Sequence, residues 1–238
     1  MQKELSEFIA SERNRFEVKH NNMFAFSFRE VERYYDFIEI IYVRHASAVK
    51  EYLKAFNALQ RTIDKSPGSH STTAEQLVLL ETLLRLGNIV QLEIESYYLF
   101  AKMLLDKIAR AVEFYFGKAH KLALDSHDDF VKCIEAYSAA KNIALDERLV
   151  TLAKKLKNDI SDFRDHQIAH LKSPRTVRGT TGDGRMSFSQ IYPTEKDEQK
   201  ETQLLDSLSS EIGEYTELVI AFIKDNKEKT ALRLNTTA

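Results

Sequence analysis

A long stripe of side chains at three-to-four-residue spacing constrains the fold of this chain more than any other feature. The stripe comprises Leu77, Leu80, Leu84, Gly87, Gln91, Ile94, Tyr98, Ala101, Leu105, Ile108, Val112 and Tyr115. Such spacing places the side chains on one face of an α-helix. Because the repeat is close to a heptad, it also suits helices that pack at a shallow angle, in an antiparallel bundle or in a dimer. The sequence therefore predicts long helices that pack side by side.

Further stripes of the same kind predict the other helices. One runs from Val31 to Ile63 and ends at a Ser-Pro-Gly-Ser segment, residues 66–69, which is typical of a loop. Ser27 and Glu30 match a capping box, in which each side chain accepts a hydrogen bond from a free backbone N–H group, so we place the start of this helix there. The expected long helices span residues 27–64, 76–117, 145–172 and 195–227, and the shorter ones span 3–18 and 126–140.

Composition supports an all-α fold. The 238 residues include only three prolines and seven glycines, and no strand-rich stretch with alternating polar and apolar residues is present. Leu, Ala, Glu and Lys dominate, and these residues favour helices. We predict a single all-α domain, residues 1–238, built as an antiparallel bundle of long helices. Its N-terminal helices, within 1–64, pack on a core formed by residues 76–228, and residues 229–238 form a frayed tail.

Charge and cysteine content limit the partners and the compartment. The net charge is −2, so contact with nucleic acid requires a local basic patch. Cys133 is the only cysteine, which excludes an intrachain disulfide and fits a reducing compartment. No apolar run is long enough for a signal peptide or a membrane span. We therefore expect a cytoplasmic protein that makes no contact with membranes.

The segment Phe163-Arg164-Asp165-His166-Gln167-Ile168-Ala169-His170 concentrates chemically useful side chains at the end of the predicted helix 145–172. With about 100° per residue, His170 falls about 20° from Phe163, at the end of the apolar stripe. A helix C-terminus favours the protonated imidazole, so His170 can titrate near neutrality and transfer protons. Arg164 lies at the rim of the stripe, and its guanidinium offers paired donors for phosphate oxygens.

These residues also fit a purely structural role. A histidine at the end of a buried stripe is often a core residue with a satisfied hydrogen bond, and an arginine beside it often forms a surface ion pair. The following segment, residues 173–193, is a long loop, and such loops are either functional or disordered. If the loop is functional, its basic residues form a phosphate-binding patch, and otherwise they form an ordinary solvated surface. These residues, with the one just before the loop, are Lys172, Arg175, Arg178 and Arg185.

The spacing Arg164-(five residues)-His170 resembles the signature of HEPN domains, in which Arg is followed by four to six residues and then His. Asp165 stands where many members have Asn. A loop and a last amphipathic helix follow the motif, and the helix that contains Tyr97–Asp106 precedes it, as in HEPN domains. The resemblance covers residues 76–228 and is greatest to the abortive-infection and toxin branch of the family.

The resemblance implies a metal-independent endoribonuclease without a cofactor, which acts as a homodimer with two Arg/His motifs facing each other across a cleft. Arg164 and His170 would be catalytic and Asp165 would orient one of them, while His166, Lys172, Arg175 and Arg178 would bind RNA. The products would be a 2′,3′-cyclic phosphate and a 5′-hydroxyl. A role as a toxin or in phage defence, with a cognate antitoxin, belongs to the same expectation.

Two other functions remain open from the sequence. Asp162, His166 and His170 are spaced at i, i+4 and i+8, so they can form one row of metal ligands on a helix, with Glu93 and Glu95 as candidates on a partner helix. Alternatively, the chain is a non-catalytic HEPN-like module that binds RNA, a nucleotide or a protein. Ribonuclease activity that survives a chelator and is lost with His170 would exclude both.

Overall fold

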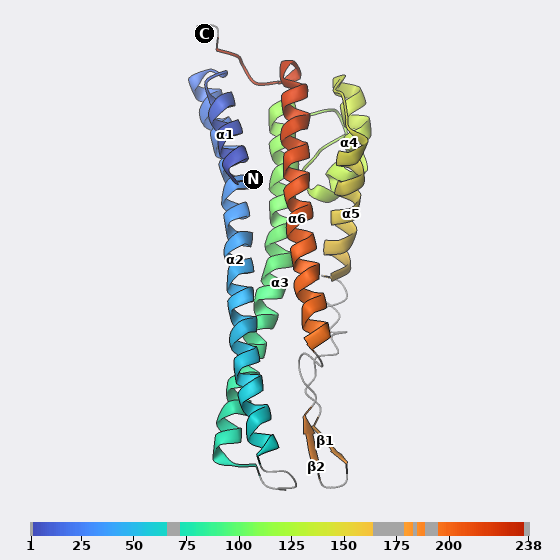
Figure 1. Cartoon of the computed structure of the whole chain (residues 1–238). Coiled ribbons are helices and arrows are strands. Elements are labelled where there is room, and N and C mark those ends of the chain that lie inside the picture. Colours follow the sequence, from blue (N-terminus) through green and yellow to red (C-terminus); the bar gives the residue numbers. More distant parts are fainter. Residues whose placement is uncertain (1, 66–71, 164–178, 183–184, 189–194, 236–238) are drawn as a thin grey trace. The chain divides into compact units, whose positions relative to one another are not determined.

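The computed structural model describes residues 2–65, 72–163, 179–182, 185–188 and 195–235, and these residues confirm the all-α helical bundle. They form six α-helices (Figure 1), namely α1 Gln2–Arg13, α2 Val18–Asp64, α3 Ala74–Phe116, α4 His127–Lys141, α5 Glu147–Phe163 and α6 Glu195–Asp225. A 3-10 turn, Lys227–Lys229, follows α6. The four predicted long helices correspond to α2, α3, α5 and α6.

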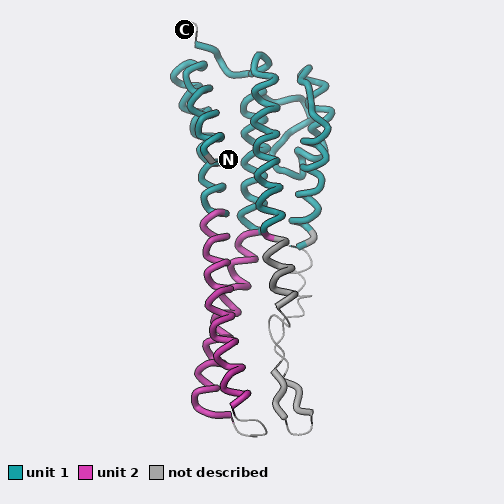
Figure 2. Tube along the Cα trace, in the orientation of Figure 1, with its two compact units in different colours: residues 1–38, 98–164, 206–238 teal, residues 39–97, 165–205 magenta. Residues whose placement is uncertain are grey.

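The chain divides into two compact units (Figure 2). Unit 1 comprises Met1–Ile38, Tyr98–Arg164 and Asp206–Ala238, and unit 2 comprises Glu39–Tyr97 and Asp165–Leu205. The boundaries fall inside α2, α3 and α6, so each of these three helices contributes one part to each unit. A single domain that spans all 238 residues stays a prediction.

Aromatic side chains build the core of unit 1. Phe24 of α2 is fully buried, and its ring centroid lies 4.8 Å from that of Phe28, 5.3 Å from that of Phe16 and 5.9 Å from that of Tyr115. Phe116 continues the cluster from α3 to Phe222 of α6, with 5.5 Å between their ring centroids. Large aromatic rings contribute most of the buried area of a core, so this cluster holds helices that are distant in the sequence.

The predicted start of α2 at Ser27 is wrong, because the helix begins nine residues earlier, at Val18. Phe24 and Phe28 extend the stripe of Val31 and Tyr35 at helical spacing, and all four are buried. The carboxylate of Glu30 pairs with Arg33 and Lys107. Burial of the upstream stripe therefore outweighs a local capping pattern.

Other predicted helix ends are confirmed. At the start of α4, Ser126 Oγ accepts a hydrogen bond from the backbone N–H of Asp129 at 3.2 Å. At the start of α5, Asp146 Oδ1 accepts one from the backbone N–H of Arg148 at 2.8 Å. Gly117 ends α3 with φ +77°, and a Cβ at this position would lie 2.7 Å from Ala231 Cβ. Glycine is therefore required there both by its left-handed backbone and by space.

The predicted fraying of the C-terminal tail is wrong for residues 230–235. The backbone N–H of Glu17 donates to the carbonyl of Arg233 at 3.0 Å, and that of Asn235 donates to the carbonyl of Arg15 at 2.8 Å. Thr230 Oγ1 and the N–H of Ala231 both donate to the carbonyl of Tyr115, each at 2.9 Å. These bonds satisfy backbone groups at the end of α3 and in the turn before α2, so the tail is part of unit 1.

Two short antiparallel strands lie within residues 173–193, where a loop was expected. Strand β1, Gly179–Gly182, pairs with β2, Arg185–Phe188, so that Thr180 lies opposite Ser187. The two intervening residues are Asp183 and Gly184, a dipeptide that strongly favours two-residue hairpin turns. This dipeptide is a local sequence signal for strand pairing that the expected loop did not take into account.

Candidate functional site

The predicted site lies outside the described residues. This holds for the three expected catalytic residues, Arg164, Asp165 and His170, and for the expected RNA-binding residues, His166, Lys172, Arg175 and Arg178. The structure therefore neither brings these side chains together nor separates them. What it describes is the helix that leads to them and its surroundings.

Helix α5 is firmly packed in unit 1 up to the residue before the motif. Its core-facing side chains are almost completely buried, namely Leu149, Ala153, Leu156 and Ile160. At its end, the ring of Phe163 stacks on Tyr98 of α3, with the centroids 3.6 Å apart and an interplanar angle of 6°. Arg164 is the next residue in the chain, so the motif starts directly after an aromatic contact between α5 and α3.

A cluster of four charged side chains joins α3, α4 and α5, and we call Lys102, Asp106, Asp128 and Lys157 the charged cluster. Lys102 Nζ lies 2.8 Å from Asp106 Oδ1 and 4.0 Å from Asp128 Oδ1, while Lys157 Nζ lies 3.8 Å from the same Asp128 oxygen. Its formal charges sum to zero. The cluster is therefore balanced internally and does not form a basic patch for phosphate.

His127 lies beside the charged cluster and is fully buried. Its backbone N–H donates to Asp106 Oδ1 at 2.7 Å, but neither ring nitrogen has a hydrogen-bond partner within the described part of the chain. The imidazole lies parallel to Phe130, and its ring centroid is 5.5 Å from that of Tyr215 in an edge-on arrangement. Burial, with a smaller contribution from Lys102, lowers the pKa of His127 to about 4. The side chain is therefore neutral near pH 7.

Tyr215 of α6 completes this buried group. Its hydroxyl is buried and has no hydrogen-bond partner among the described residues, and burial raises its pKa. His127 was not among the site residues expected from the sequence. The sequence feature that indicates burial of His127 is its helical spacing with Phe130, Ile134 and Tyr137. All three are fully buried in α4.

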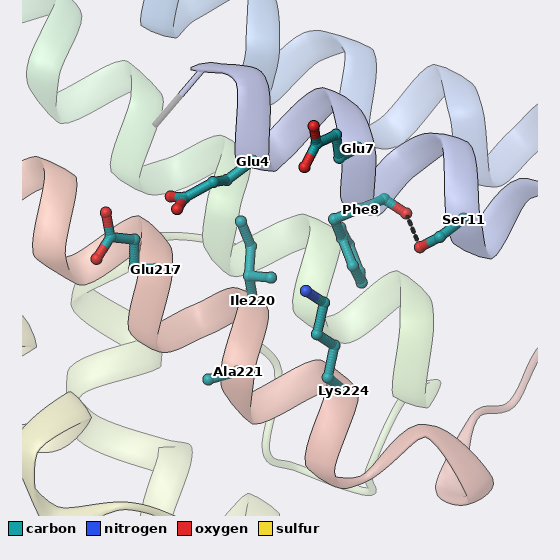
Figure 3. Close-up of a pocket in the computed structure, with 8 residues that line it drawn as sticks. All are labelled: Glu4, Glu7, Phe8, Ser11, Glu217, Ile220, Ala221 and Lys224. Carbon is teal, nitrogen blue, oxygen red and sulfur yellow. Dashed lines mark hydrogen bonds between the residues drawn. The ribbon is translucent and has the colours of Figure 1, made fainter.

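A groove of about 550 Å³ lies between α1 and α6 in unit 1 (Figure 3). The residues that line it are Glu4, Glu7, Phe8, Ser11, Glu217, Ile220, Ala221 and Lys224. The amino group of Lys224 lies 5.8 Å from the centroid of the Phe8 ring. Three carboxylates and one ammonium give the groove an acidic character, which disfavours a phosphate backbone. None of the predicted site residues lines it.

The metal-site hypothesis gains nothing from the described residues. No group of three His, Cys, Asp or Glu side chains in that part of the chain could hold a metal ion. Glu93 is buried and forms an ion pair with Arg44 of α2, with Nη2 and Oε1 2.5 Å apart. His166 and His170 lie outside the described residues, so their pairing with other ligands stays a hypothesis.

The chain matches no family model, no curated protein and no solved structure. The resemblance to HEPN domains therefore rests on the motif and its place in the sequence. None of the described helices combines the length and apolar composition needed to cross a membrane.

Proposed function

We propose that this protein is a metal-independent endoribonuclease of the HEPN type. One observation supports this above all others: the Arg164-(five residues)-His170 motif begins directly after Phe163, where α5 ends its packing on α3. The helix before the motif is anchored in the core, and α6 follows in the sequence. Catalytic side chains need such a rigid support to hold their geometry.

In the proposed reaction, one His170 takes the proton from a ribose 2′-hydroxyl, and the 2′-oxygen attacks the adjacent phosphorus. The bond from phosphorus to the 5′-oxygen breaks, and a second histidine or a water molecule protonates the leaving oxygen. Arg164 stabilises the negative charge on the pentavalent transition state. The products are a 2′,3′-cyclic phosphate and a 5′-hydroxyl, so the reaction requires neither a metal nor a redox partner.

The proposal includes a homodimer, because two motifs facing each other supply both the acid and the base. Lys172, Arg175, Arg178 and His166 bind the RNA backbone, and Asp165 orients Arg164 or His170. A cytoplasmic toxin or phage-defence role with a cognate antitoxin fits such an activity.

The test is cleavage of a mixed RNA pool with chelator present, followed by end-group analysis. His170→Ala is expected to lower the rate by about 10² to 10⁴, and Arg164→Ala by about 10² to 10³. His120→Ala and Arg148→Ala are matched controls, because both side chains are exposed and lie outside the motif. The controls are expected to cleave like the wild type.

Two results would contradict the proposal. Folded wild-type protein that leaves RNA intact would favour the non-catalytic binding module. Activity that disappears with chelator, and that falls as far in His166→Ala as in His170→Ala, would favour the metal site instead.

A further inference from the structure

One face of α3 in unit 2 exposes large aliphatic side chains. Leu77, Val78, Leu84, Ile89 and Leu92 are between 37% and 62% exposed. With 100° per residue, all five fall within a sector of about 140°. The opposite side of the same stretch is buried, at Leu83, Val90 and Ile94. Single exposed apolar residues are normal, whereas a contiguous stripe marks an interaction surface.

Three exposed polar residues lie among these side chains and determine which partner fits. Glu81, Arg85 and Asn88 are exposed in the same sector. We call these eight residues of α3 the 77–92 face. Because it carries one acid and one base a single turn apart, the face is complementary to a copy of itself in the reverse direction. A parallel copy in register would instead place Glu81 against Glu81 and Arg85 against Arg85, and like charges destabilise a helix pair.

The antiparallel arrangement can be worked out from helix geometry. If a two-fold axis passes between Leu84 and Arg85, Leu77 lies opposite Leu92 of the second copy, and Glu81 lies opposite Asn88. Glu81 is then offset from Arg85 of the second copy by about 4.5 Å along the helix axis, within reach of an ion pair. Leucines thus meet at both ends of the contact and polar groups in between. Such self-complementarity is what a symmetric dimer interface requires.

We propose that the 77–92 face is the surface through which two copies of this chain pair in antiparallel orientation. The proposed ribonuclease requires only that two motifs meet, so this inference goes beyond it by naming a contact that holds the copies together. One helix face is small beside the roughly 800 Å² per partner of a standard interface. The dimer is therefore expected to be concentration-dependent.

Cysteine crosslinking tests the register directly. In a Cys133→Ser background, Leu84→Cys is expected to form an intermolecular disulfide under mild oxidation, because the two copies of residue 84 are offset by only about 1.5 Å along the axis. Leu77→Cys alone should not crosslink, since its own copy is about 23 Å away along the axis. A mixture of Leu77→Cys and Leu92→Cys should crosslink again. Equal crosslinking of all single cysteines, or none, would overturn the proposal.

Sedimentation of charge variants tests the surface without cysteine. Leu84→Glu is expected to shift the protein to monomer, and circular dichroism should show unchanged helix content because Leu84 is half exposed. Phe26→Glu is the matched control, since Phe26 is an exposed apolar residue of α2 in unit 1. Glu81→Arg or Arg85→Glu should each weaken the dimer, and the double exchange should restore it.

Other occupants of the face give different results. If the Leu84→Cys variant is monomeric and its introduced thiol resists labelling, another segment of the same chain covers the face, and the proposal is overturned. The ribonuclease assay on the same samples separates the two proposals. Cleavage without a crosslink in the Leu84→Cys variant would reject only the dimer surface, and a crosslink without cleavage would reject only the nuclease.

Discussion

The two halves of α3 are both rich in apolar residues but have different surroundings. In unit 1, Tyr98, Leu105 and Val112 are buried among other helices, whereas in unit 2 Leu77 and Leu84 remain about half exposed. All five belong to one seven-residue repeat. A straight α-helix drifts by about 20° per heptad against such a repeat, so from Leu77 to Leu105 the stripe turns by about 80°. Side chains that belong to one stripe in the sequence can therefore face different elements along the helix.

This difference teaches that an apolar residue is a core residue only where other elements cover it. Unit 1 contains α1, α4 and α5 in addition to its parts of α2, α3 and α6, and these supply partners for several faces of α3. In the described part of α3 within unit 2, Leu83 and Val90 are covered while Leu84 and Leu92 are not.

Truncating one leucine in each half of α3 tests this difference in coverage with the largest expected effect. Leu105→Ala is expected to lower the free energy of unfolding by about 2–5 kcal/mol, because Leu105 is fully buried and its loss leaves a cavity. Leu84→Ala, at a half-exposed site, should change it by no more than about 0.5 kcal/mol. Urea denaturation of both variants at a concentration where the protein is monomeric measures the difference. Equal losses would mean that the two halves are equally covered.

The next largest expected effect is a dependence of stability on pH that arises from His127 in unit 1. Burial lowers the pKa of His127 to about 4, below the unfolded value of about 6.5, so the folded state binds fewer protons. The stabilisation is complete above pH 6.5 and declines as the pH falls towards 4, with a total loss of about 3 kcal/mol. His127→Leu should remove this dependence, while His120→Leu, at an exposed site, should retain it. Thermal unfolding between pH 7 and pH 4 distinguishes them, and identical pH profiles for both variants and the wild type would contradict the prediction.

The smallest expected effect concerns the side-chain hydrogen bonds of Asn226 in unit 1. Asn226 Oδ1 accepts from the N–H of Ala144 at 2.8 Å, and its Nδ2 donates to the carbonyls of Ala144 and Phe222 at 2.9 and 2.8 Å. Asn226→Ala removes three hydrogen bonds, of which the two with Ala144 are only partly buried, and is expected to cost about 1 kcal/mol. Hydrogen exchange should show faster exchange at Ala144. Asn57→Ala serves as a control, because Asn57 is an exposed asparagine of α2, and an equal loss of stability in both variants would contradict the prediction.

Sequence patterns predicted those features that depend on regular spacing. Ile94, Leu105 and Val112 of the predicted stripe in α3 are buried, because helical periodicity fixes the face on which each side chain lies. The start of α2 was missed because a capping pattern is a local signal, and burial of Phe24 and Phe28 outweighs it. The paired tail was missed because hydrogen bonds from Glu17 to Arg233 join segments that no local pattern connects.

The candidate site was only partly accessible to sequence reasoning. The motif at Arg164 and His170 could be found because its residues lie close together in the sequence. It lies outside the described residues, so its role stays a prediction. The apolar surroundings of the His127 imidazole could not be found. They depend on Phe130 and Tyr215 packing against the ring, and Tyr215 comes from a helix far along the chain.

The hydrogen bonds between the C-terminal segment and the turn before α2 impose an order on folding during synthesis. Residues 15–17 leave the ribosome early, but their backbone partners at 233–235 are made last among the described residues. The backbone pairing of unit 1 therefore cannot be completed before residues 233–235 have been synthesised, whereas the first part of α3 can form a helix earlier. Limited proteolysis of stalled nascent chains would detect this as a late gain of protection at residues 15–17. During that interval Phe16 lacks its backbone pairing with Leu234, and apolar surface that stays exposed before folding is complete is prone to aggregation.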